Sequence, residues 1–134
     1  MIACTRQAIE EESWINKMEK LQTLVKALDS KHVADMVAID MRKHASLYDF
    51  MIISTARNER IISGVLRELK DLGQTENFNL KFIEGHQGAE WVLADFGDMV
   101  VHVFNEEMRA KYQLDKLWGD ASRVDIKAWL NDGV

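Results

Sequence analysis

The chain has 134 residues, of which 47% are hydrophobic, so it can form a single domain around one sizeable core. Charged residues make up 29%, and no apolar run approaches the roughly 18 residues of a membrane span, so we expect no membrane association. The net charge of −5 predicts no direct DNA binding and limited RNA contact, because Lys and Arg supply much of the affinity for phosphates.

The first residues, MIACTRQAIEEES (1–13), predict a loose leader. Their three consecutive glutamates and lack of an apolar stretch are atypical of a secretory signal or a transit peptide. Cys4 is the only cysteine, so no disulfide framework is expected. These features favour a cytoplasmic protein.

Apolar periodicity predicts the first elements of the domain. A helix is expected from Trp14, with Ser13 as its N-cap. Two nearly continuous apolar runs, at 35–41 and 48–55, predict buried strands. The apolar face of the helix comprises Ile15, Met18, Leu21, Val25 and Leu28.

A second helix and three more strands are expected next. Asn58 is placed to cap the helix, and Gly73 to end it. Residues 78–85 predict a strand, and residues 91–104 predict a hairpin whose turn needs the backbone freedom of Gly97. In the last strand, Met99, Val101 and Val103 should share one face, and Val100, His102 and Phe104 the other.

The end of the chain is less regular. Asn105 should cap a short helix, and Ser122-x-x-Asp125 could start one more turn or helix within a helical or mobile tail at 119–134. We therefore expect an α/β fold with a single domain, in which helices flank a five-stranded mixed β-sheet.

The sequence offers little for catalysis, so neither a cofactor nor a metal is expected. No glycine-rich phosphate motif follows a strand, and Cys4 lies in the leader. The histidines are far apart and lack metal-ligand spacing: His32, His44, His86 and His102. Carboxylates near strand ends do not form the alternating acid pair of a nucleotidyltransferase site: Asp35, Asp40, Asp49, Glu84, Asp95 and Asp98.

Aromatic and apolar residues collect late in the chain, beside Arg109 and Lys111. Tyr, Trp and Arg are enriched where interfaces bind most strongly. The members of this group are Trp91, Phe104, Tyr112, Leu117 and Trp118. Taken alone, the residues leave two interpretations open: a docking surface for a partner, or the completion of the core.

The chain resembles the ribosomal silencing factor family, also called the Iojap-like family. The matching segments are DMVAIDM, ASLYDFMIIST and EGHQGAEWVLADFGDMVVHVFNEEMRAKYQLDKLW, of which the last is the most specific. The resemblance covers roughly residues 17 to 118, which places the domain at 14–118. Its pattern falls on Ser46, Asp49, Thr55, Glu84, Gly85, Trp91, Asp95, Gly97, Asp98, His102, Arg109, Tyr112, Leu114, Leu117 and Trp118.

The resemblance implies a protein that is not an enzyme and a fold with nucleotidyltransferase-like topology. Such a protein binds the large ribosomal subunit through its fourteenth ribosomal protein, blocks joining of the small subunit and represses translation. The resemblance also leaves open a homodimer of the free protein. Partner-binding positions are then expected at Trp91, Phe104, Arg109, Tyr112, Leu114, Leu117 and Trp118. Structural positions are expected at Asp49, Gly85, Asp95, Gly97 and His102.

Two departures from the family pattern affect what can be carried over. The usual Thr-Gly turn after the second strand is replaced by STARNER, with Ala56 and Asn58, so no function is assigned to it. The family's Tyr-x-Leu-Glu is Tyr112-Gln-Leu-Asp115 here, so Asp115 stays outside the expected site. The alternative function is a nucleotidyltransferase-like enzyme or a nucleotide-binding module.

Overall fold

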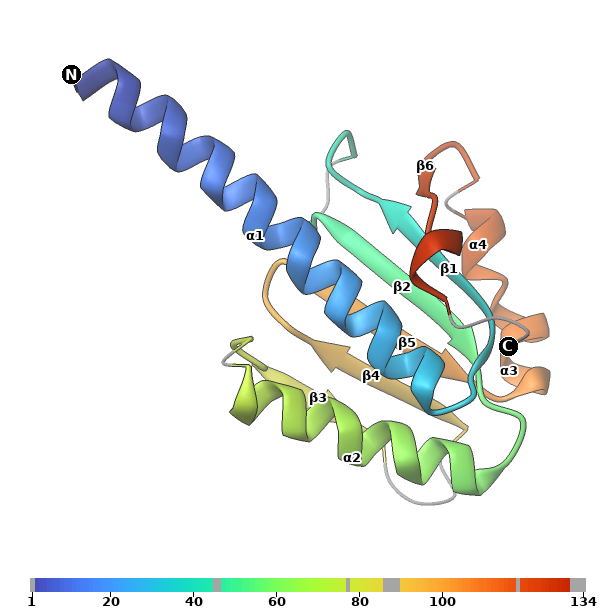
Figure 1. The fold of residues 1–134 in the computed structure, drawn as a ribbon. Coiled ribbons are helices and arrows are strands. Elements are labelled where there is room, and N and C mark those ends of the chain that lie inside the picture. The colour runs from blue at the N-terminus through green and yellow to red at the C-terminus, as the bar shows by residue number, and fades with distance from the viewer. Residues whose placement is uncertain (1, 45–46, 77, 86–89, 118, 131–134) are drawn as a thin grey trace.

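A six-stranded mixed sheet with the strand order β3-β4-β5-β2-β1-β6 forms the centre of the molecule (Figure 1). The computed structural model describes residues 2–44, 47–76, 78–85, 90–117 and 119–130, with side chains in the first helix described from Asn16 onward. The protein is a single α/β domain. None of the described helices combines the length and the apolar character needed to cross a bilayer.

The two central strands of the sheet run parallel, and every other neighbouring pair is antiparallel. Strand β2 (Phe50–Thr55) pairs with β5 (Met99–Phe104), so that Thr55 lies opposite Phe104 where both strands end. Strand β1 (Ala34–Asp40) pairs with β2 on its other edge. These strands lie where the apolar runs predicted them.

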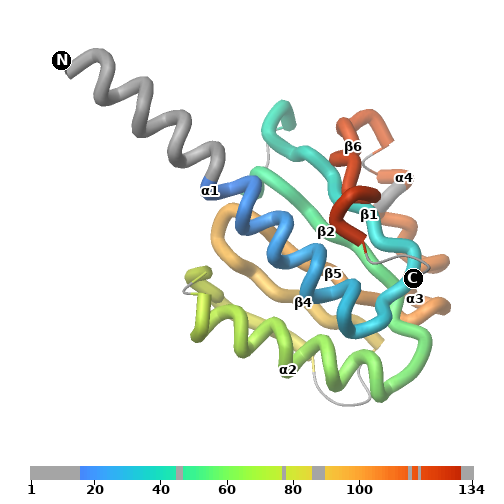
Figure 2. Tube along the Cα trace, in the orientation of Figure 1, coloured from blue at the N-terminus to red at the C-terminus, as the bar shows by residue number. Residues whose placement is uncertain are grey.

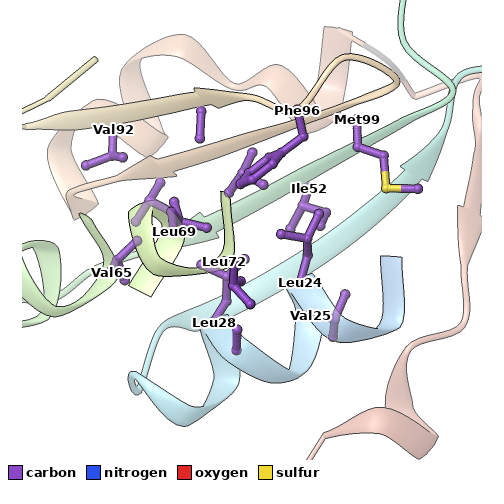
Figure 3. Packing of buried hydrophobic residues seen from close by; sticks show 14 of the residues in the cluster. Leu24, Val25, Leu28, Ile52, Val65, Leu69, Leu72, Val92, Phe96 and Met99 are labelled. Carbon is purple, nitrogen blue, oxygen red and sulfur yellow. The ribbon is translucent and has the colours of Figure 1, made fainter. Parts of the chain in front are cut away.

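One face of the sheet is covered by two long helices that lie side by side (Figure 2). Helix α1 (Ile2–Ser30) contributes a buried stripe, and α2 (Glu59–Thr75) contributes a second one. Figure 3 shows side chains from both helices meeting those of the sheet. The buried residues of the helices are Leu21, Leu24, Val25, Ala27, Leu28, Ile62, Val65, Leu66, Leu69 and Leu72.

Helix α1 begins earlier than the sequence predicted. It starts at Ile2, so Ser13 lies inside the helix and does not cap it at Trp14. A serine is common at a helix N-cap but can also occur inside a helix, and Ser13 lies inside one here. The expected loose leader is therefore helical from Ile2 onward.

Helix α2 begins as predicted but ends differently. The side chain of Asn58 accepts a hydrogen bond from the backbone N–H of Ile61 at 2.9 Å, which confirms the predicted N-cap. Gly73, expected to stop the helix, lies within it, and the C-cap is Glu76. A Cβ on Gly73 would lie 2.8 Å from the Cβ of Leu80, so close packing, and not helix termination, explains this glycine.

The hairpin follows the sequence prediction closely, but the strand before it is short. Strands β4 (Trp91–Asp95) and β5 are joined by a turn in which Gly97 has a φ of 92°, in the left-handed region that favours glycine. Strand β3 spans only Phe82–Glu84, against an expected 78–85. Asn79, with a φ of 58°, interrupts the extended backbone that a longer strand would need.

The C-terminal region supplies the sixth strand, which the sequence prediction lacked. Strand β6 (Ser122–Val124) pairs antiparallel with β1, so Ser122 lies in a strand and starts no helix. Asp125 accepts a hydrogen bond from the backbone N–H of Lys127 at 3.1 Å, and a single 3-10 turn, η1 (Lys127–Trp129), follows with Ile126 as its N-cap residue. The expected five-stranded sheet is therefore corrected to six strands.

The opposite face of the sheet carries a smaller apolar cluster and two short helices. Helices α3 (Glu106–Tyr112) and α4 (Leu114–Leu117) follow β5, and Met108 and Leu114 pack against this cluster. Its buried members are Ile39, Met41, Met51, Ile53, Val100, Phe104 and Ala121. The alternation predicted for β5 is confirmed, because Met99, Val101 and Val103 belong to the core under α1 and α2.

Candidate docking surface

Four rings from β4, β5 and α3 form one contiguous group, which we call the aromatic cluster: Trp91, His102, Phe104 and Tyr112. The ring centroid of Trp91 lies 4.9 Å from that of Phe104 and 5.4 Å from that of Tyr112. Phe104 is stacked on His102 and on Tyr112, with centroid distances of 5.9 and 6.4 Å. The sequence separates Trp91 from Tyr112, and the antiparallel pairing of β4 with β5 brings them together.

The members of the aromatic cluster differ in exposure. Tyr112 is 45% exposed and Trp91 is half-buried, whereas Phe104 is completely buried. Phe104 therefore presents no surface to a partner, and its expected role in direct binding is corrected: it lies beneath Tyr112 and supports that ring. Beside the cluster, Leu117 is 70% exposed and Leu114 is half-buried.

His102 is the buried polar member of the aromatic cluster, as its position in the middle of a strand predicted. Its Nδ1 accepts a hydrogen bond from the indole Nε1 of Trp91 at 3.1 Å. Burial lowers the pKa of His102 from 6.5 to about 4, because the charged imidazolium loses its hydration there. The imidazole is thus a neutral structural group at physiological pH.

Helix α3 holds the exposed part of the cluster in place through its cap and one arginine. Asn105 caps the helix by accepting a hydrogen bond from the backbone N–H of Met108 at 2.8 Å. Arg109 reaches back to β2, where its guanidinium donates a hydrogen bond to the Oγ1 of Thr55 at 3.0 Å. Tyr112 comes one turn after Arg109, so both side chains lie on the side of α3 that meets the sheet.

Charged side chains surround the aromatic cluster. Glu106 and Glu107 are exposed at the start of α3, where the helix dipole favours carboxylates. Glu90 lies next to them, because its carbonyl accepts a hydrogen bond from the backbone N–H of Asn105 at 2.9 Å. At the other end of α3, the Nζ of Lys111 lies 5.6 Å from the ring centroid of Tyr112.

Asp95, Gly97 and Gly85, three of the expected structural positions, shape the backbone at the two ends of β4, and the turn at Gly97 lies at the end far from Trp91. Asp95 accepts hydrogen bonds from the backbone N–H of Gly97 and from the hydroxyl of Tyr48, each at 2.8 Å, and so closes the hairpin turn. Gly85 has a φ of 131°, and a Cβ there would lie 3.1 Å from Val92. Burial and the hydrogen bond to Asp95 raise the pKa of Tyr48.

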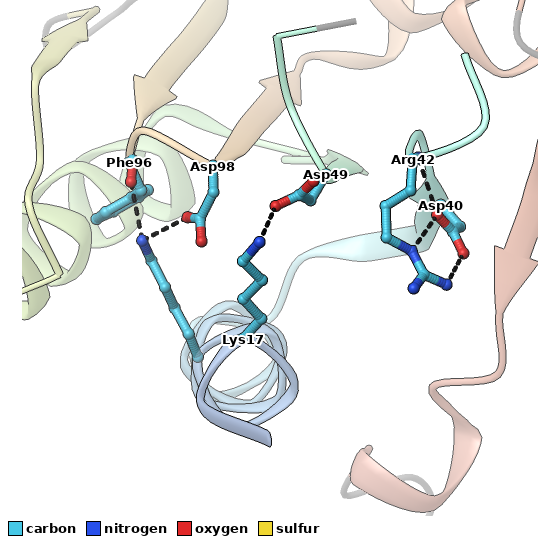
Figure 4. Close-up of polar contacts among 7 residues, drawn as sticks. Lys17, Asp40, Arg42, Asp49, Phe96 and Asp98 are labelled. Atoms are coloured by element: carbon cyan, nitrogen blue, oxygen red, sulfur yellow. Dashed lines mark hydrogen bonds and ion pairs between the residues drawn. The ribbon is translucent and has the colours of Figure 1, made fainter. Parts of the chain in front are cut away.

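Two aspartates at the starts of the parallel strands hold helix α1 (Figure 4). Lys17 pairs with Asp49 at 2.7 Å, and Lys20 pairs with Asp98 at 2.7 Å. The ammonium of Lys20 also donates a hydrogen bond to the carbonyl of Phe96 at 2.8 Å. These contacts give Asp49 and Asp98 a structural role.

Several carboxylates at the strand ends have separate cationic partners. Asp40 accepts a hydrogen bond from the Nε of Arg42 at 2.8 Å, and this bond lowers the pKa of the carboxyl group. Asp49 and Asp98 bind Lys17 and Lys20 of α1. Among the residues that the structure describes, no group of three or more His, Cys, Asp or Glu side chains is arranged to hold a metal ion.

The structure brings Trp91, Phe104 and Tyr112 of the expected set together, and it shows further contacts in the sheet that the sequence did not indicate. Thr55 appeared only as a position of the family pattern, and neither Lys20 nor Tyr48 was singled out. The only signal for Thr55 is its place at the end of a buried strand, which says nothing about a partner on α3. Ser46 and Trp118, which the family pattern also includes, lie outside the described residues.

The sequence of this chain is similar to those of a known protein family. The profile of a family described as ribosomal silencing factor during starvation matches residues 14–133. The chain is 39% identical to a ribosomal silencing factor of Halalkalibacterium halodurans over 113 residues, and this alignment covers 84% of this chain and 97% of that relative. It is 35% identical to the ribosomal silencing factor of Bacillus subtilis over 117 residues, and this alignment covers 87% of this chain and 99% of that relative.

A solved structure agrees with this relationship. A crystal structure of a protein from Bacillus halodurans superposes with a TM-score of 0.70 at 41% identity, covering 81% of this chain and 98% of that chain. The residues that the family profile matches include β4, β5 and α3, which carry the aromatic cluster. The chain belongs to the ribosomal silencing factor family.

Proposed function

We propose that this protein silences ribosomes by binding the large ribosomal subunit through its fourteenth ribosomal protein, which blocks joining of the small subunit and represses translation in the cytoplasm. Family membership over residues 14–133 carries the proposal. The relatives in Halalkalibacterium halodurans and Bacillus subtilis are named as ribosomal silencing factors.

The aromatic cluster and its neighbours on α3 and α4 are the surface we assign to this docking. Tyr112 and Leu117 are large apolar side chains left substantially exposed, and Trp91 is half-buried beside them. Tyr and Trp are enriched among the residues that contribute most of the binding energy when a partner covers them. Trp118, Leu114 and Arg109 complete the proposed docking set.

The charge near the surface suits a basic partner. Glu90, Glu106 and Glu107 are exposed beside the aromatic cluster, and the whole chain has a net charge of −5. Ribosomal proteins are typically basic, and opposite charge speeds the encounter of two proteins. A second copy of the chain could cover Tyr112 and Leu117 in the free protein, which would give a homodimer.

We further propose that the protein acts without catalysis, although the resemblance implies a nucleotidyltransferase-like topology. The separate cationic partners of Asp40, Asp49 and Asp98 support this. Thermal unfolding with ATP or CTP and Mg²⁺ tests the alternative. A nucleotide at about 100 times its dissociation constant would stabilise the protein by about 2.7 kcal/mol, whereas we expect no shift.

Co-sedimentation with purified subunits tests the main proposal. The protein should pellet with large subunits, should not pellet with small ones, and should lower the yield of joined ribosomes. Equal binding to both subunits, or joining that proceeds unchanged at saturating protein, would overturn the proposal.

A further inference from the structure

Helix α3 carries the centre of the proposed docking surface yet has little of its own to fix its orientation. It spans only Glu106–Tyr112, and none of its residues is buried. A helix of this length is unstable in isolation, because it cannot offset the cost of forming its first turn. Its orientation therefore depends on the contacts that join it to the sheet.

One of those contacts is the hydrogen bond between the side chains of Arg109 and Thr55, which we call the tie. The hydrogen bond from the guanidinium to the Oγ1 of Thr55 measures 3.0 Å, and Thr55 is only 3% exposed. The acceptor is held rigidly, because Thr55 ends the central strand β2 in parallel register with Phe104. A hydrogen bond from a charged donor to a buried acceptor is stronger than a neutral one and is costly to leave unmade.

The tie acts at the position where it can orient Tyr112. Phe104, the register partner of Thr55, is stacked under the ring of Tyr112 with a centroid distance of 6.4 Å. Arg109 precedes Tyr112 by one helical turn. The end of the β2–β5 pair thus contacts α3 twice, through the hydroxyl of Thr55 and through the ring of Phe104.

We propose that Thr55 is a positioning residue for docking: its hydroxyl holds Arg109, and Arg109 thereby holds α3 so that Tyr112 meets the partner in one orientation. This inference rests on the proposed function. Arg109 then has two roles, because it belongs to the docking surface and also fixes the orientation of α3. A helix already oriented in the free protein loses less conformational entropy when it binds.

The test compares Thr55→Val, which removes the acceptor but keeps the shape, with Thr55→Ser, which keeps the hydroxyl. Binding to purified large subunits is measured as association and dissociation rates, well below the melting temperature of each variant. We expect Thr55→Val to weaken binding about tenfold, equal to about 1.4 kcal/mol, and Thr55→Ser to bind within about twofold of the unmodified protein. The double variant Thr55→Val with Arg109→Ala should be no weaker than Arg109→Ala alone, because both changes break the same tie.

A second measurement needs no ribosome. Hydrogen exchange of the free protein should show faster exchange of the α3 amides in Thr55→Val and in Arg109→Ala, with exchange in α2 and β5 unchanged. A merely global loss of stability would instead accelerate exchange in all elements. The variant Arg109→Ala, at a half-buried position, keeps this measurement decisive if Thr55→Val does not fold.

The outcomes separate this inference from the proposed function. If the unmodified protein does not bind large subunits, the proposed function fails, and hydrogen exchange alone decides whether the tie orients α3. If the unmodified protein binds, and Thr55→Val binds equally well while Arg109→Ala does not, Arg109 acts by direct contact with the partner and the inference is overturned. Unchanged exchange of α3 in both variants would overturn it as well.

Discussion

The indole Nε1 of Trp91 donates a hydrogen bond to the Nδ1 of His102 across the pair of strands β4 and β5, over 3.1 Å. An indole N–H can only donate, so the Nδ1 of His102 must accept, and the neutral imidazole carries its proton on Nε2. Protonation of Nδ1 would break this bond and place a charge inside the aromatic cluster. The stability of the docking surface therefore depends on the protonation state of His102.

The first prediction concerns stability at acid pH. The pKa of His102 is lowered to about 4 in the folded protein, against 6.5 for an exposed histidine. The unfolded chain therefore binds the proton first, and stability should be complete above pH 6.5 and fall as the pH drops toward 4. The full loss from this group is about 3 kcal/mol, measured by urea unfolding across that range.

The control for this prediction is His102→Phe, which keeps a ring in the same place but cannot titrate. Its free energy of unfolding should fall less steeply between pH 6.5 and 4 than that of the unmodified protein. Parallel curves for the two proteins would show that other groups cause the acid sensitivity.

The second prediction separates docking from folding. Tyr112 and Phe82 are aromatic residues of nearly equal exposure, 45% and 44%, but Phe82 lies on the edge strand β3, opposite Asp95, at the far end of β4 from Trp91. Tyr112→Ala should weaken large-subunit binding by at least about 2 kcal/mol and leave the melting temperature within a few degrees. Phe82→Ala should leave binding unchanged, and equal losses in co-sedimentation would place the docking surface elsewhere.

The third prediction uses two glycines of helix α2. A Cβ at Gly64 meets only the side chain of Lys31, at 3.7 Å, whereas a Cβ at Gly73 would lie 2.8 Å from the Cβ of Leu80. Gly64→Ala should stabilise the protein by up to about 1 kcal/mol through helix propensity. Gly73→Ala should destabilise it by about 1–3 kcal/mol through overpacking. Chemical denaturation of both variants tests this, and a stabilising Gly73→Ala would contradict the packing argument.

The fourth prediction compares two lysines of α1. The side chain of Lys17 is 35% exposed and pairs with Asp49 in contact with solvent, so Lys17→Met should change the free energy of unfolding by less than about 1 kcal/mol. The side chain of Lys20 is only 12% exposed and holds both Asp98 and the carbonyl of Phe96. Lys20→Met should lower the free energy of unfolding by about 2 kcal/mol, because it leaves these acceptors without their donor. Equal effects of the two changes would show that the buried contacts add nothing.

The fifth prediction concerns salt. Docking led by an acidic chain on a basic protein should weaken as the salt concentration rises, mainly through slower association. The logarithm of the binding constant, plotted against the logarithm of the salt concentration, should have a slope whose magnitude is well below the value of about 5 given by six phosphate contacts. A slope of that size, measured by titration at several salt concentrations, would identify RNA as the main partner.

Local sequence determined the features that depend on a few neighbouring residues. The alternation of Met99, Val101 and Val103 with Val100, His102 and Phe104 assigned each side chain to its face, because successive side chains of a strand point in opposite directions. The caps Asn58 and Asn105 and the turn at Gly97 were also predicted, since each satisfies a requirement of its own backbone. The family signature of 84–118 likewise lies within one continuous stretch.

Only the tertiary structure decided which distant segments meet. Nothing local in Ser122–Val124 specifies β1 as its partner, and the close approach of Leu80 to Gly73 arises from a crossing of two segments. In the same way, the burial of Phe104 and the tie between Thr55 and Arg109 exist because β2 and β5 run parallel and end together. A sequence pattern records the face and the backbone geometry of a residue, whereas its partner across the fold depends on how the whole chain packs.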